Sequence, residues 1–280
     1  MEQPANRGCW APELKGRTAV ITGAGRLRSI GREIALELAR QGVNIVLTGS
    51  GKSPDLYPED EKAIGWRDID SVAEEVVAAG AQALPLVSDA GDPAAVAALI
   101  AAAEQRFGGI DILINNASAA VGADRAPIVD LNLAVWDHLM HVNLRGAFLV
   151  GQAAARSMVA RGQGGSIVNI SSIASRLAAP SLGAYAVSKA GLDTLSRVMA
   201  MELASHKIRV NSVLPGSIAT ARMDKAFASP GWDEHLKRFI PLGYPGNGSE
   251  IAWMCTYLCS DMGAWITGQD IAVDGGTTWH

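Results

Sequence analysis

The chain of 280 residues carries a net charge of −4 at pH 7, and 49% of its residues are hydrophobic. This length allows one or two domains with a large core, and the mildly acidic balance gives no reason to propose a nucleic-acid or anionic-membrane partner. No apolar run reaches membrane-spanning length and residues 1–7 lack the apolar core of a signal peptide, so we expect a cytoplasmic protein without a membrane partner.

Apolar periodicity predicts regularly alternating strands and helices after a loose arm over residues 1–14, where Trp10 is expected to dock on the body. The predicted strands span residues 17–22, 43–48, 82–88, 110–115, 165–171, 207–214 and 270–273. The predicted helices span residues 30–41, 68–79, 92–107, 132–161, 183–205 and 248–260. Because such alternation forms a parallel sheet covered on both faces, we predict an α/β fold with a single doubly wound parallel sheet, in one domain over residues 15–280.

The first predicted strand runs into a glycine-rich turn. Thr18–Thr22 is followed by Gly23, Gly25 and Gly31, and a helical pattern begins there. Backbone amides at such a helix start bind a pyrophosphate, and glycine lets the backbone approach it closely. An ordinary strand-to-helix turn also needs glycine where φ is positive, so the turn alone is weak support for a nucleotide site.

Tyr185-x-x-x-Lys189, with Ser172 after the fifth predicted strand, indicates a proton-transfer site. A helix places residues four apart on one face. A phenol titrates near ~10, and an ammonium about 4 Å away at an effective dielectric of about 20 contributes roughly 4 kcal/mol, or about 3 pKa units. That shift would bring the pKa of Tyr185 close to neutral, while Ser172 polarises the same substrate oxygen. For the motif taken alone, a chance pair on a helix surface is the alternative.

Two segments are irregular. Residues 49–67 are long for a strand-to-helix connection and rich in charge, proline and glycine, so they are interpreted as a cover over a cofactor's adenosine end, a surface insertion or an oligomer contact. Residues 219–248 precede the last helix, and their apolar side chains can pack as local core, whereas the resemblance to a known family that the motifs carry implies a lid over the substrate in this segment: Met223, Phe227, Trp232 and Phe239.

Together these motifs resemble those of the short-chain dehydrogenase/reductase family over nearly the whole chain. The matching elements, in order, are Thr22-Gly23 to Gly31, Asp89, Asn115-Asn116-Ala117, Asn143, Ser172, Tyr185, Lys189, Pro215-Gly216 and Asp274-Gly275-Gly276. The resemblance implies a Rossmann-like domain that binds a dinucleotide and carries out catalysis. It also implies a catalytic tetrad of Asn143, Ser172, Tyr185 and Lys189. Ser171 is the nearest rival to Ser172, but the thirteen-residue interval to Tyr185 favours Ser172.

The glycine-rich turn departs from the family's usual Thr-Gly-x-x-x-Gly-x-Gly. Here it is two residues longer, and Ser29 stands where the middle glycine usually lies. Enoyl-thioester reductases of the same superfamily have a longer turn of similar look, but they usually have a wider Tyr-to-Lys spacing. The spacing here therefore favours carbonyl and alcohol chemistry over reduction of a carbon–carbon double bond.

The reaction that the resemblance implies is reversible hydride transfer between nicotinamide C4 and a carbonyl carbon, which interconverts a ketone or aldehyde with an alcohol (EC 1.1.1.-). Tyr185 would exchange the proton, Lys189 would lower its pKa and bind the nicotinamide ribose, and Ser172 would hold the substrate oxygen. Asn143 would position a water that links Lys189 to solvent. One alternative is a 3-oxoacyl-thioester reductase that docks a carrier protein through a basic patch, with Arg125, Arg176 and Arg222 as candidates. Another is a non-catalytic NADP-sensing scaffold, which would usually lack one tetrad residue.

The segment after the second predicted strand bears on the choice of cofactor. It reads Leu47-Thr48-Gly49-Ser50-Gly51-Lys52, without the acid that binds the ribose 2′-hydroxyl of NAD in this kind of sheet. Gly49 leaves room for a 2′-phosphate, and four residues are candidates to bind it: Arg26, Arg28, Ser50 and Lys52. We therefore expect NADP(H), with NAD(H) as the alternative if Asp55 returns to the ribose.

The other cofactor contacts follow from the resemblance. Asp89, followed by Ala90, is expected at the adenine, and Asn115 and Ala117 are expected along the adenosine. The glycine-rich turn supplies contacts through Gly23, Gly25, Arg26, Arg28, Ser29 and Ile30. The nicotinamide end is expected to contact Tyr185, Lys189, Pro215, Gly216, Ile218 and Thr220.

The sequence predicts neither a disulfide framework nor a metal site. Cys255 and Cys259 lie four apart in a predicted helix and are interpreted as packed thiols. His138 and His141 lie three apart without an evident third ligand, so they are interpreted as surface or core histidines.

The resemblance also implies assembly through the predicted helices 132–161 and 183–205, with the C-terminal segment in a second interface. Small residues in the first of these helices permit close packing: Ala153, Ala154 and Ala155. We therefore expect a two-fold-symmetric homotetramer, with a dimer as the alternative.

Overall fold

The computed structural model describes residues 8–120 and 122–279, and its centre is a seven-stranded sheet in which every pairing is parallel. The strand order is β3-β2-β1-β4-β5-β6-β7. The strands are β1 Thr18–Thr22, β2 Asn44–Gly49, β3 Ala83–Val87, β4 Ile112–Asn115, β5 Gly165–Ile170, β6 Ile208–Pro215 and β7 Asp270–Val273. The order reverses between β1 and β4, and ligands of such sheets bind at that switch point, beyond the carboxyl ends of the strands.

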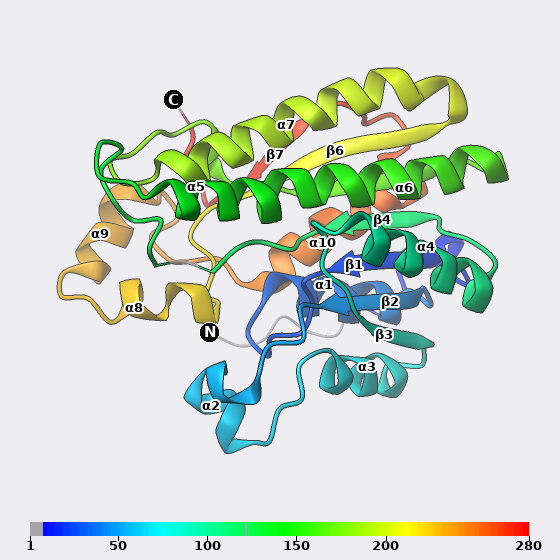
Figure 1. Cartoon of the computed structure of the whole chain (residues 1–280), viewed down its shortest axis with the longest axis horizontal. Coiled ribbons are helices and arrows are strands. Elements are labelled where there is room, and N and C mark those ends of the chain that lie inside the picture. The colour runs from blue at the N-terminus through cyan, green and yellow to red at the C-terminus, as the bar shows by residue number, and fades with distance from the viewer. Residues whose placement is uncertain (1–7, 121, 280) are drawn as a thin grey trace.

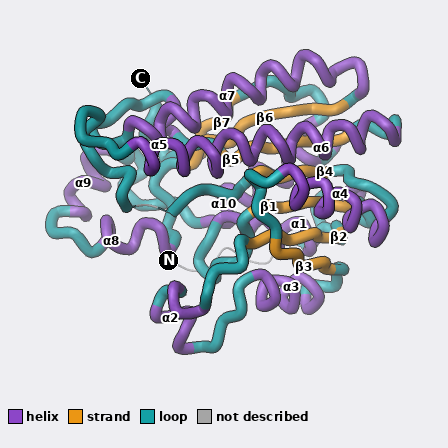
Figure 2. Tube along the Cα trace, in the orientation of Figure 1, coloured by secondary structure: helices purple, strands orange, loops and turns teal. Residues whose placement is uncertain are grey.

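Helices cover both faces of the sheet (Figure 1). The helices of the main body are α1 Ile30–Arg40, α3 Ile69–Ala78, α4 Pro93–Phe107, α5 Leu133–Met140, α6 Gly146–Arg161, α7 Gly183–Leu203 and α10 Gly248–Cys259. The helix α2 Glu59–Ala63 lies at the lower edge of Figure 1, and α8 Asp224–Phe227 and α9 Trp232–Phe239 lie toward one end of the molecule, on the left. Long loops gather near that end as well (Figure 2). The predicted doubly wound fold is confirmed.

Two apolar clusters sandwich the sheet, which explains why its central strands are buried on both faces. All five residues of β1 are buried. On one face, α1, α3 and α10 pack on the sheet through side chains such as Ile34, Val72 and Ile251. On the other face, α4, α6 and α7 pack through side chains such as Leu99, Val150 and Met199.

The helix predicted over residues 132–161 is continuous but not uniform. A π-helical turn, His141–Arg145, joins α5 to α6. Such turns are rare and occur often at functional sites. The turn contains Asn143, which the resemblance places in the catalytic tetrad.

The N-terminal contacts agree in part with the predicted loose arm. Trp10 docks as predicted, because its backbone N–H donates to Gln41 Oε1 at 2.8 Å and its indole N–H donates to Glu37 Oε1 at 2.9 Å. Ala11 and Leu14 are already buried in the core. Residues 1–7 of the predicted arm lie outside the described residues.

Cys255 and Cys259 are free, buried thiols on α10, as predicted.

Within the described residues, no helix is both long enough and apolar enough to span a membrane.

Candidate active site

Tyr185, Lys189 and Ser172 meet just beyond the end of β5. Tyr185 and Lys189 lie one turn apart on α7, and Ser172 lies two residues after the last residue of β5. All three line a cavity of about 450 Å³. The buried Lys189 donates from Nζ to the Ile170 carbonyl at 2.8 Å, and Nζ lies 5.8 Å from the Tyr185 ring centroid. The structure therefore brings together the three side chains that the sequence groups.

Opposing effects act on the Tyr185 phenol. Burial raises its pKa. The pKa is lowered by the positive charges of Lys189, Arg222 and Arg125 and by a hydrogen bond from Ser172, and the net result is a pKa below the ordinary value of 10.0. The Arg222 and Arg125 guanidinium carbons lie 5.0 Å and 5.8 Å from the ring centroid. Because a proton-transfer group works best with a pKa near the operating pH, this shift suits Tyr185 for acid–base chemistry.

Lys189 is held by the same environment. Burial lowers the pKa of its ammonium group, and the positive charge of Arg222 lowers it further. Tyr185 and Asp193 act in the opposite direction, but the pKa remains below its ordinary value. Ser171, the rival to Ser172, is buried and donates from Oγ to the Lys189 carbonyl at 3.3 Å. Its hydroxyl is thus directed to the α7 backbone, while that of Ser172 bonds the phenol.

Asn143 is buried behind the catalytic side chains. Its Oδ1 accepts from the Ala119 backbone N–H at 2.8 Å, and its Nδ2 donates to Ser188 Oγ at 3.0 Å. The side chain therefore braces the segment after β4 against α7. The contact with Ser188 places Asn143 against the helix that carries Tyr185 and Lys189, an arrangement compatible with the water link that the resemblance implies.

The glycine-rich turn is too tight for side chains. A Cβ on Gly23 would lie 2.7 Å from Ala117 Cα, and one on Gly31 would lie 2.5 Å from Asn116 Nδ2. Asn116 Nδ2 also donates to the carbonyls of Thr22 and Gly23, at 2.9 Å and 2.8 Å. This cradle at a helix start fits a dinucleotide pyrophosphate. The cavity beside it is lined by Gly23, Arg26, Arg28, Ser29 and Ile30.

Ser29 has a local reason to replace a glycine. Its side chain is the N-cap of α1 and accepts from the Arg32 N–H at 3.2 Å. Serine is among the residues that favour this position.

The adenosine residues differ in how well they fit their expected roles. Asp89 is exposed, its Oδ1 accepts from the Gly91 N–H at 2.8 Å, and its Oδ2 lies 4.0 Å from His141 Nε2. The Asn115 side chain instead faces the interior and donates to Ala147 O and Asn169 Oδ1. A cofactor contact from Asn115 would therefore be made by its backbone. Ala90 lies beside Gly146, and Ala117 donates its N–H to Thr22 Oγ1 at 3.0 Å.

Arg26 and Arg28, expected to bind a 2′-phosphate, are both paired with carboxylates. Arg26 Nη1 lies 2.9 Å from Glu61 Oε2, with its guanidinium 4.2 Å from the Tyr57 ring centroid. Arg28 Nε lies 2.7 Å from Asp60 Oδ2, and its two terminal nitrogens donate to the Asp224 carboxylate at 2.6 Å and 2.5 Å. The carboxylates of Glu61, Asp60 and Asp224 would therefore compete with a 2′-phosphate for these guanidinium groups, and the role expected of Arg26 and Arg28 stays a prediction.

The insertion over residues 49–67 is fastened to the glycine-rich turn. Glu61 is buried and accepts the Leu27 N–H at 2.9 Å, and the Trp66 indole donates to the Gly25 carbonyl at 2.7 Å. Asp68, directly after the insertion, lies against both Gly25 and Gly49. Asp55, which the sequence offers as the returning acid, is exposed and bonds Ser53. Ser50 and Lys52 are exposed after β2.

The residues that the sequence predicts at the nicotinamide end all line the catalytic cavity. The cavity beside Tyr185 is lined by Pro215, Gly216, Ile218 and Thr220. Of the apolar residues in the predicted lid, Met223 also lines this cavity. Phe227 and Trp232 instead pack on each other with ring centroids 5.3 Å apart, and Phe239 is half exposed.

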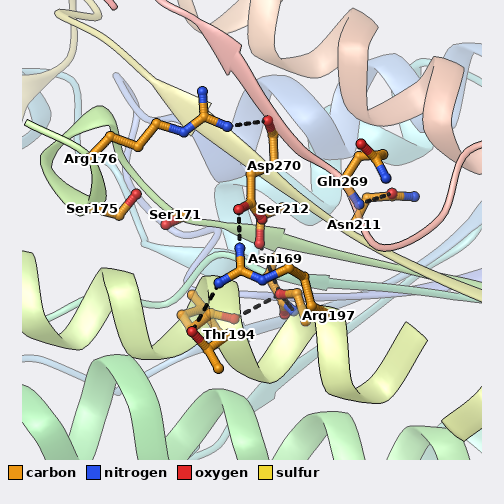
Figure 3. Close-up of polar contacts among 12 residues, drawn as sticks. Asn169, Ser171, Ser175, Arg176, Thr194, Arg197, Asn211, Ser212, Gln269 and Asp270 are labelled. Carbon is orange, nitrogen blue, oxygen red and sulfur yellow. Dashed lines mark hydrogen bonds and ion pairs between the residues drawn. The ribbon is translucent and has the colours of Figure 1, made fainter. Parts of the chain in front are cut away.

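The three candidate arginines for a docking patch separate in the structure. Arg125 and Arg222 line the catalytic cavity. Arg176 donates to the Asp270 carbonyl at 2.6 Å, and the Asp270 carboxylate pairs with Arg197 (Figure 3). Arg176 is thus held at the start of β7, so it does not join Arg125 and Arg222, the other two candidates that the sequence offers for a docking patch.

The contacts of Glu61 and Asp68 with the glycine-rich turn could not be predicted from the sequence, because both depend on how the insertion folds back. The sequence shows a cluster of acids at the end of a long insertion, but it does not indicate which residues they contact. Among the described residues, no three His, Cys, Asp or Glu side chains are grouped as a metal site would require.

The fold and this cavity define a dinucleotide-dependent oxidoreductase, and comparison with known proteins gives the family. The sequence model described as enoyl-(acyl carrier protein) reductase matches residues 23–278. L-rhamnose 1-dehydrogenase (NAD(P)(+)) of Azotobacter vinelandii is 36% identical over 94% of this chain and 97% of its own length. Gluconate 5-dehydrogenase of Gluconobacter oxydans is 35% identical over 95% of this chain and 96% of its own.

Solved structures agree. A short-chain type dehydrogenase/reductase from Mycobacterium marinum superposes with a TM-score of 0.80 at 32% identity, covering 95% of this chain and 96% of that one. The chain belongs to the short-chain dehydrogenase/reductase family, whose members are NAD(P)-dependent oxidoreductases acting on CH–OH groups.

Proposed function

We propose that the protein interconverts an alcohol with a ketone or aldehyde, with Tyr185 as the proton donor and acceptor. The observation that supports this most is the Ser172–Tyr185–Lys189 cluster, which lines one cavity with the segment after β6. A bound nicotinamide dinucleotide supplies or accepts the hydride. The protein residues hold the substrate oxygen and move the proton.

The proton path follows from the side-chain contacts. In reduction, Tyr185 donates to the substrate oxygen while Ser172 hydrogen-bonds the same atom. The positive charges of Lys189 and Arg222 stabilise the phenolate that remains, and in oxidation that phenolate is the base. Because Lys189 Nζ also donates to the Ile170 carbonyl, the ammonium is fixed beside the ring. Asn143 is proposed to position the water that returns the proton.

We further propose that the substrate carries a carboxylate. Arg222 Nη1 donates to two neutral acceptors, Ser118 Oγ at 3.2 Å and the Ala119 carbonyl at 3.0 Å. Arg125 Nε lies 3.6 Å from Asp124 Oδ2. Two guanidinium groups beside the catalytic phenol favour an anionic substrate, since arginine binds carboxylates through paired donors. The name of the gluconate 5-dehydrogenase relative is consistent with a hydroxy acid.

The alternative is a 3-oxoacyl-thioester reductase. The description of the matching family model names the acyl carrier protein, and Arg125 and Arg222 remain at the cavity to meet an acidic partner. Arg176 does not join them, which weakens the docking-patch argument. A non-catalytic NADP-sensing scaffold is less well supported, because all four tetrad residues are present.

The preference for NADP(H) predicted from the sequence rests on Arg26 and Arg28 as ligands of the 2′-phosphate and on the lack of an acid directly after β2. The carboxylate partners of Arg26 and Arg28 weaken the first argument, and the position of Asp68 beside Gly49 weakens the second. We therefore propose use of NAD(P)(H) without that preference. A homotetramer acting in the cytoplasm stays part of the proposal.

A substrate panel tests the reaction. Purified protein is offered sugar acids, other hydroxy acids, neutral sugars, secondary alcohols and an acetoacetyl thioester with each dinucleotide, and reduced-cofactor absorbance is followed. We expect turnover of a hydroxy acid. Selective turnover of the thioester would favour the alternative, and turnover of neutral alcohols alone would contradict the carboxylate proposal.

The assignment of Tyr185 is tested on the best substrate. Tyr185→Phe keeps the ring and removes the proton, so turnover should fall about a hundred-fold to ten-thousand-fold with dinucleotide binding retained. Tyr257→Phe, on α10, is the matched control and should be active. If Tyr185→Phe keeps most of its turnover while chemistry limits the rate, Tyr185 is not the proton donor.

A further inference from the structure

We propose that Asp68 binds the hydroxyl groups of the adenosine ribose and thereby selects NAD(H) over NADP(H). This inference rests on the proposed dinucleotide binding but not on the identity of the substrate. In sheets of this kind, an acid close to the end of the second strand accepts hydrogen bonds from the ribose 2′-hydroxyl. No acid follows β2 directly in this chain, so that role is open to a residue from elsewhere.

The position of the Asp68 carboxylate is the main observation. A Cβ on Gly25 would lie 1.7 Å from Asp68 Oδ1, and a Cβ on Gly49 would lie 2.7 Å from Asp68 Oδ2. Gly25 belongs to the glycine-rich turn, and Gly49 is the last residue of β2. The carboxylate therefore lies between the two segments that flank the adenosine ribose in this fold. An acid on the strand itself would reach the same place.

The carboxylate also lacks the local role that its position in sequence suggests. Asp68 is the N-cap residue of α3, yet its side chain makes no capping hydrogen bond. Its backbone has φ 53° and ψ −128°, a conformation that costs energy for any residue with a Cβ. Such strained residues occur often at ligand sites, where the surrounding structure holds them in place.

The insertion supplies that support. Trp66, two residues before Asp68, donates its indole N–H to the Gly25 carbonyl at 2.7 Å. Glu61 accepts the Leu27 N–H at 2.9 Å and pairs with Arg26. Three points of contact with the glycine-rich turn, at residues 25, 26 and 27, thus fix the chain that delivers Asp68.

Charge at the site favours a ribose with free hydroxyl groups. A 2′-phosphate would meet the Asp68 carboxylate, and like charges at contact disfavour each other. The two arginines of the turn offer little compensation, because Arg26 is paired with Glu61 and Arg28 with Asp60 and Asp224. Lys52 is the remaining nearby cation and is exposed.

Binding of dinucleotides without substrate tests the proposal. Dissociation constants of NADH and NADPH are measured by calorimetry for the full-length wild type, Asp68→Asn and Asp55→Asn. Asp55 is the matched control, since it is an acid of the same insertion that bonds Ser53. We expect the wild type to bind NADH more tightly. Asp68→Asn should weaken NADH binding about ten-fold to a hundred-fold, as loss of a charge-assisted hydrogen bond implies, and narrow or reverse the preference.

Two results would overturn the role of Asp68. One is a wild type that binds NADPH more tightly than NADH, and the other is an Asp68→Asn variant in which the binding of both dinucleotides is weakened equally. A change of preference in Asp55→Asn alone would assign the ribose to Asp55. If Asp68→Asn does not fold, Asp68→Gly takes its place, because glycine suits the positive φ. Failure of the wild type to bind either dinucleotide would instead refute the proposed function.

Discussion

At the residue scale, the catalytic phenol is governed by the charges that surround it. Burial alone would make Tyr185 a poorer acid, and it is the cationic neighbours, together with the Ser172 hydroxyl, that reverse the shift. Lys189 is the nearest of them in sequence, but Arg222 and Arg125 come from loops after β6 and β4. The acidity of Tyr185 therefore depends on residues that are distant in sequence from the helix that carries it.

Replacing Arg222 should move the pH dependence of catalysis. Arg222→Met removes a positive charge near the ring, which destabilises the phenolate and raises the pKa of Tyr185. The rise of kcat/KM with pH in alcohol oxidation should then shift upward, by about half a unit to one unit because the guanidinium is partly screened by solvent. The profile is measured on a neutral alcohol, so that substrate charge does not enter.

Arg176→Met is the matched control for this shift, because Arg176 is bonded at the start of β7. Its profile should coincide with that of the wild type. An unchanged profile in Arg222→Met, or a shift toward lower pH, would show that Arg222 does not act on the phenol.

Residue-level predictions succeeded where the relevant partners are close in sequence. Tyr185 and Lys189 share one helix, so their spacing alone predicts that they meet. Asp68 was missed because its partners, Gly25 and Gly49, lie in other elements and are reached only after the insertion folds back. The carboxylate partners of Arg26 and Arg28 could not be predicted for the same reason, since neither the Glu61 nor the Asp224 contact has a sequence signature.

At the scale of elements, a chain of buried polar side chains fixes α7 on the sheet. Asn115 in β4 donates to Asn169 in β5 at 2.8 Å, Asn169 donates to Ser196 of α7 at 2.7 Å, and Ser212 in β6 donates to Ser196 at 2.8 Å. Figure 3 shows Asn169 and Ser212 of this group beside α7. Since α7 carries Tyr185 and Lys189, the group helps to set their position above the strand ends.

Asn169→Ala should be strongly destabilising. It removes one hydrogen-bond partner from each of the buried Asn115 and Ser196 side chains, which keep their bonds to the Ala147 carbonyl and to Ser212, and a buried polar group that loses its partner costs about 1–3 kcal/mol. We expect a loss of roughly 2–4 kcal/mol in the free energy of unfolding, measured by urea denaturation.

Gln163→Ala, at an exposed position after α6, is the control and should change the free energy by less than about 0.5 kcal/mol. An Asn169→Ala protein as stable as the wild type would mean that water replaces the lost bonds.

Element boundaries were predictable because hydrophobic runs and helical periods repeat through the chain, and strands such as β1 and β5 begin and end within a residue or two of their predicted limits. The π-helical turn at His141–Arg145 was not predictable, since it interrupts neither the period nor the composition. The short helix α2 was also missed, because the charged sequence around it has no apolar face to reveal it.

At the scale of the whole molecule, the outer face of α6 and α7 is apolar and open. A groove of about 560 Å³ runs between these helices. Phe148, Val198 and Met201 are exposed to 41%, 39% and 73% along them. Trp265 near the C-terminus is exposed to 99%. Exposed apolar patches of this kind mark protein contacts, which supports the expected homotetramer.

Introducing charge into this face should disrupt assembly. Phe148→Glu together with Val198→Glu places carboxylates in the expected contact between helices, so the species seen by light scattering should become smaller than the wild type. Val77→Glu, at an exposed apolar position on α3, should leave the assembly unchanged. A wild-type protein that is a stable monomer at micromolar concentration would contradict the prediction.

The insertion between β2 and α3 has a consequence for protein engineering. In a simpler sheet, the residue at the strand end must both pack and recognise the ribose, so a change made for one purpose disturbs the other. Here Gly49 ends the strand, and the acid is delivered by a separate segment that can be altered without touching the sheet. A designer who wishes to exchange one cofactor for the other would therefore edit residues 50–68 and leave the seven strands as they are.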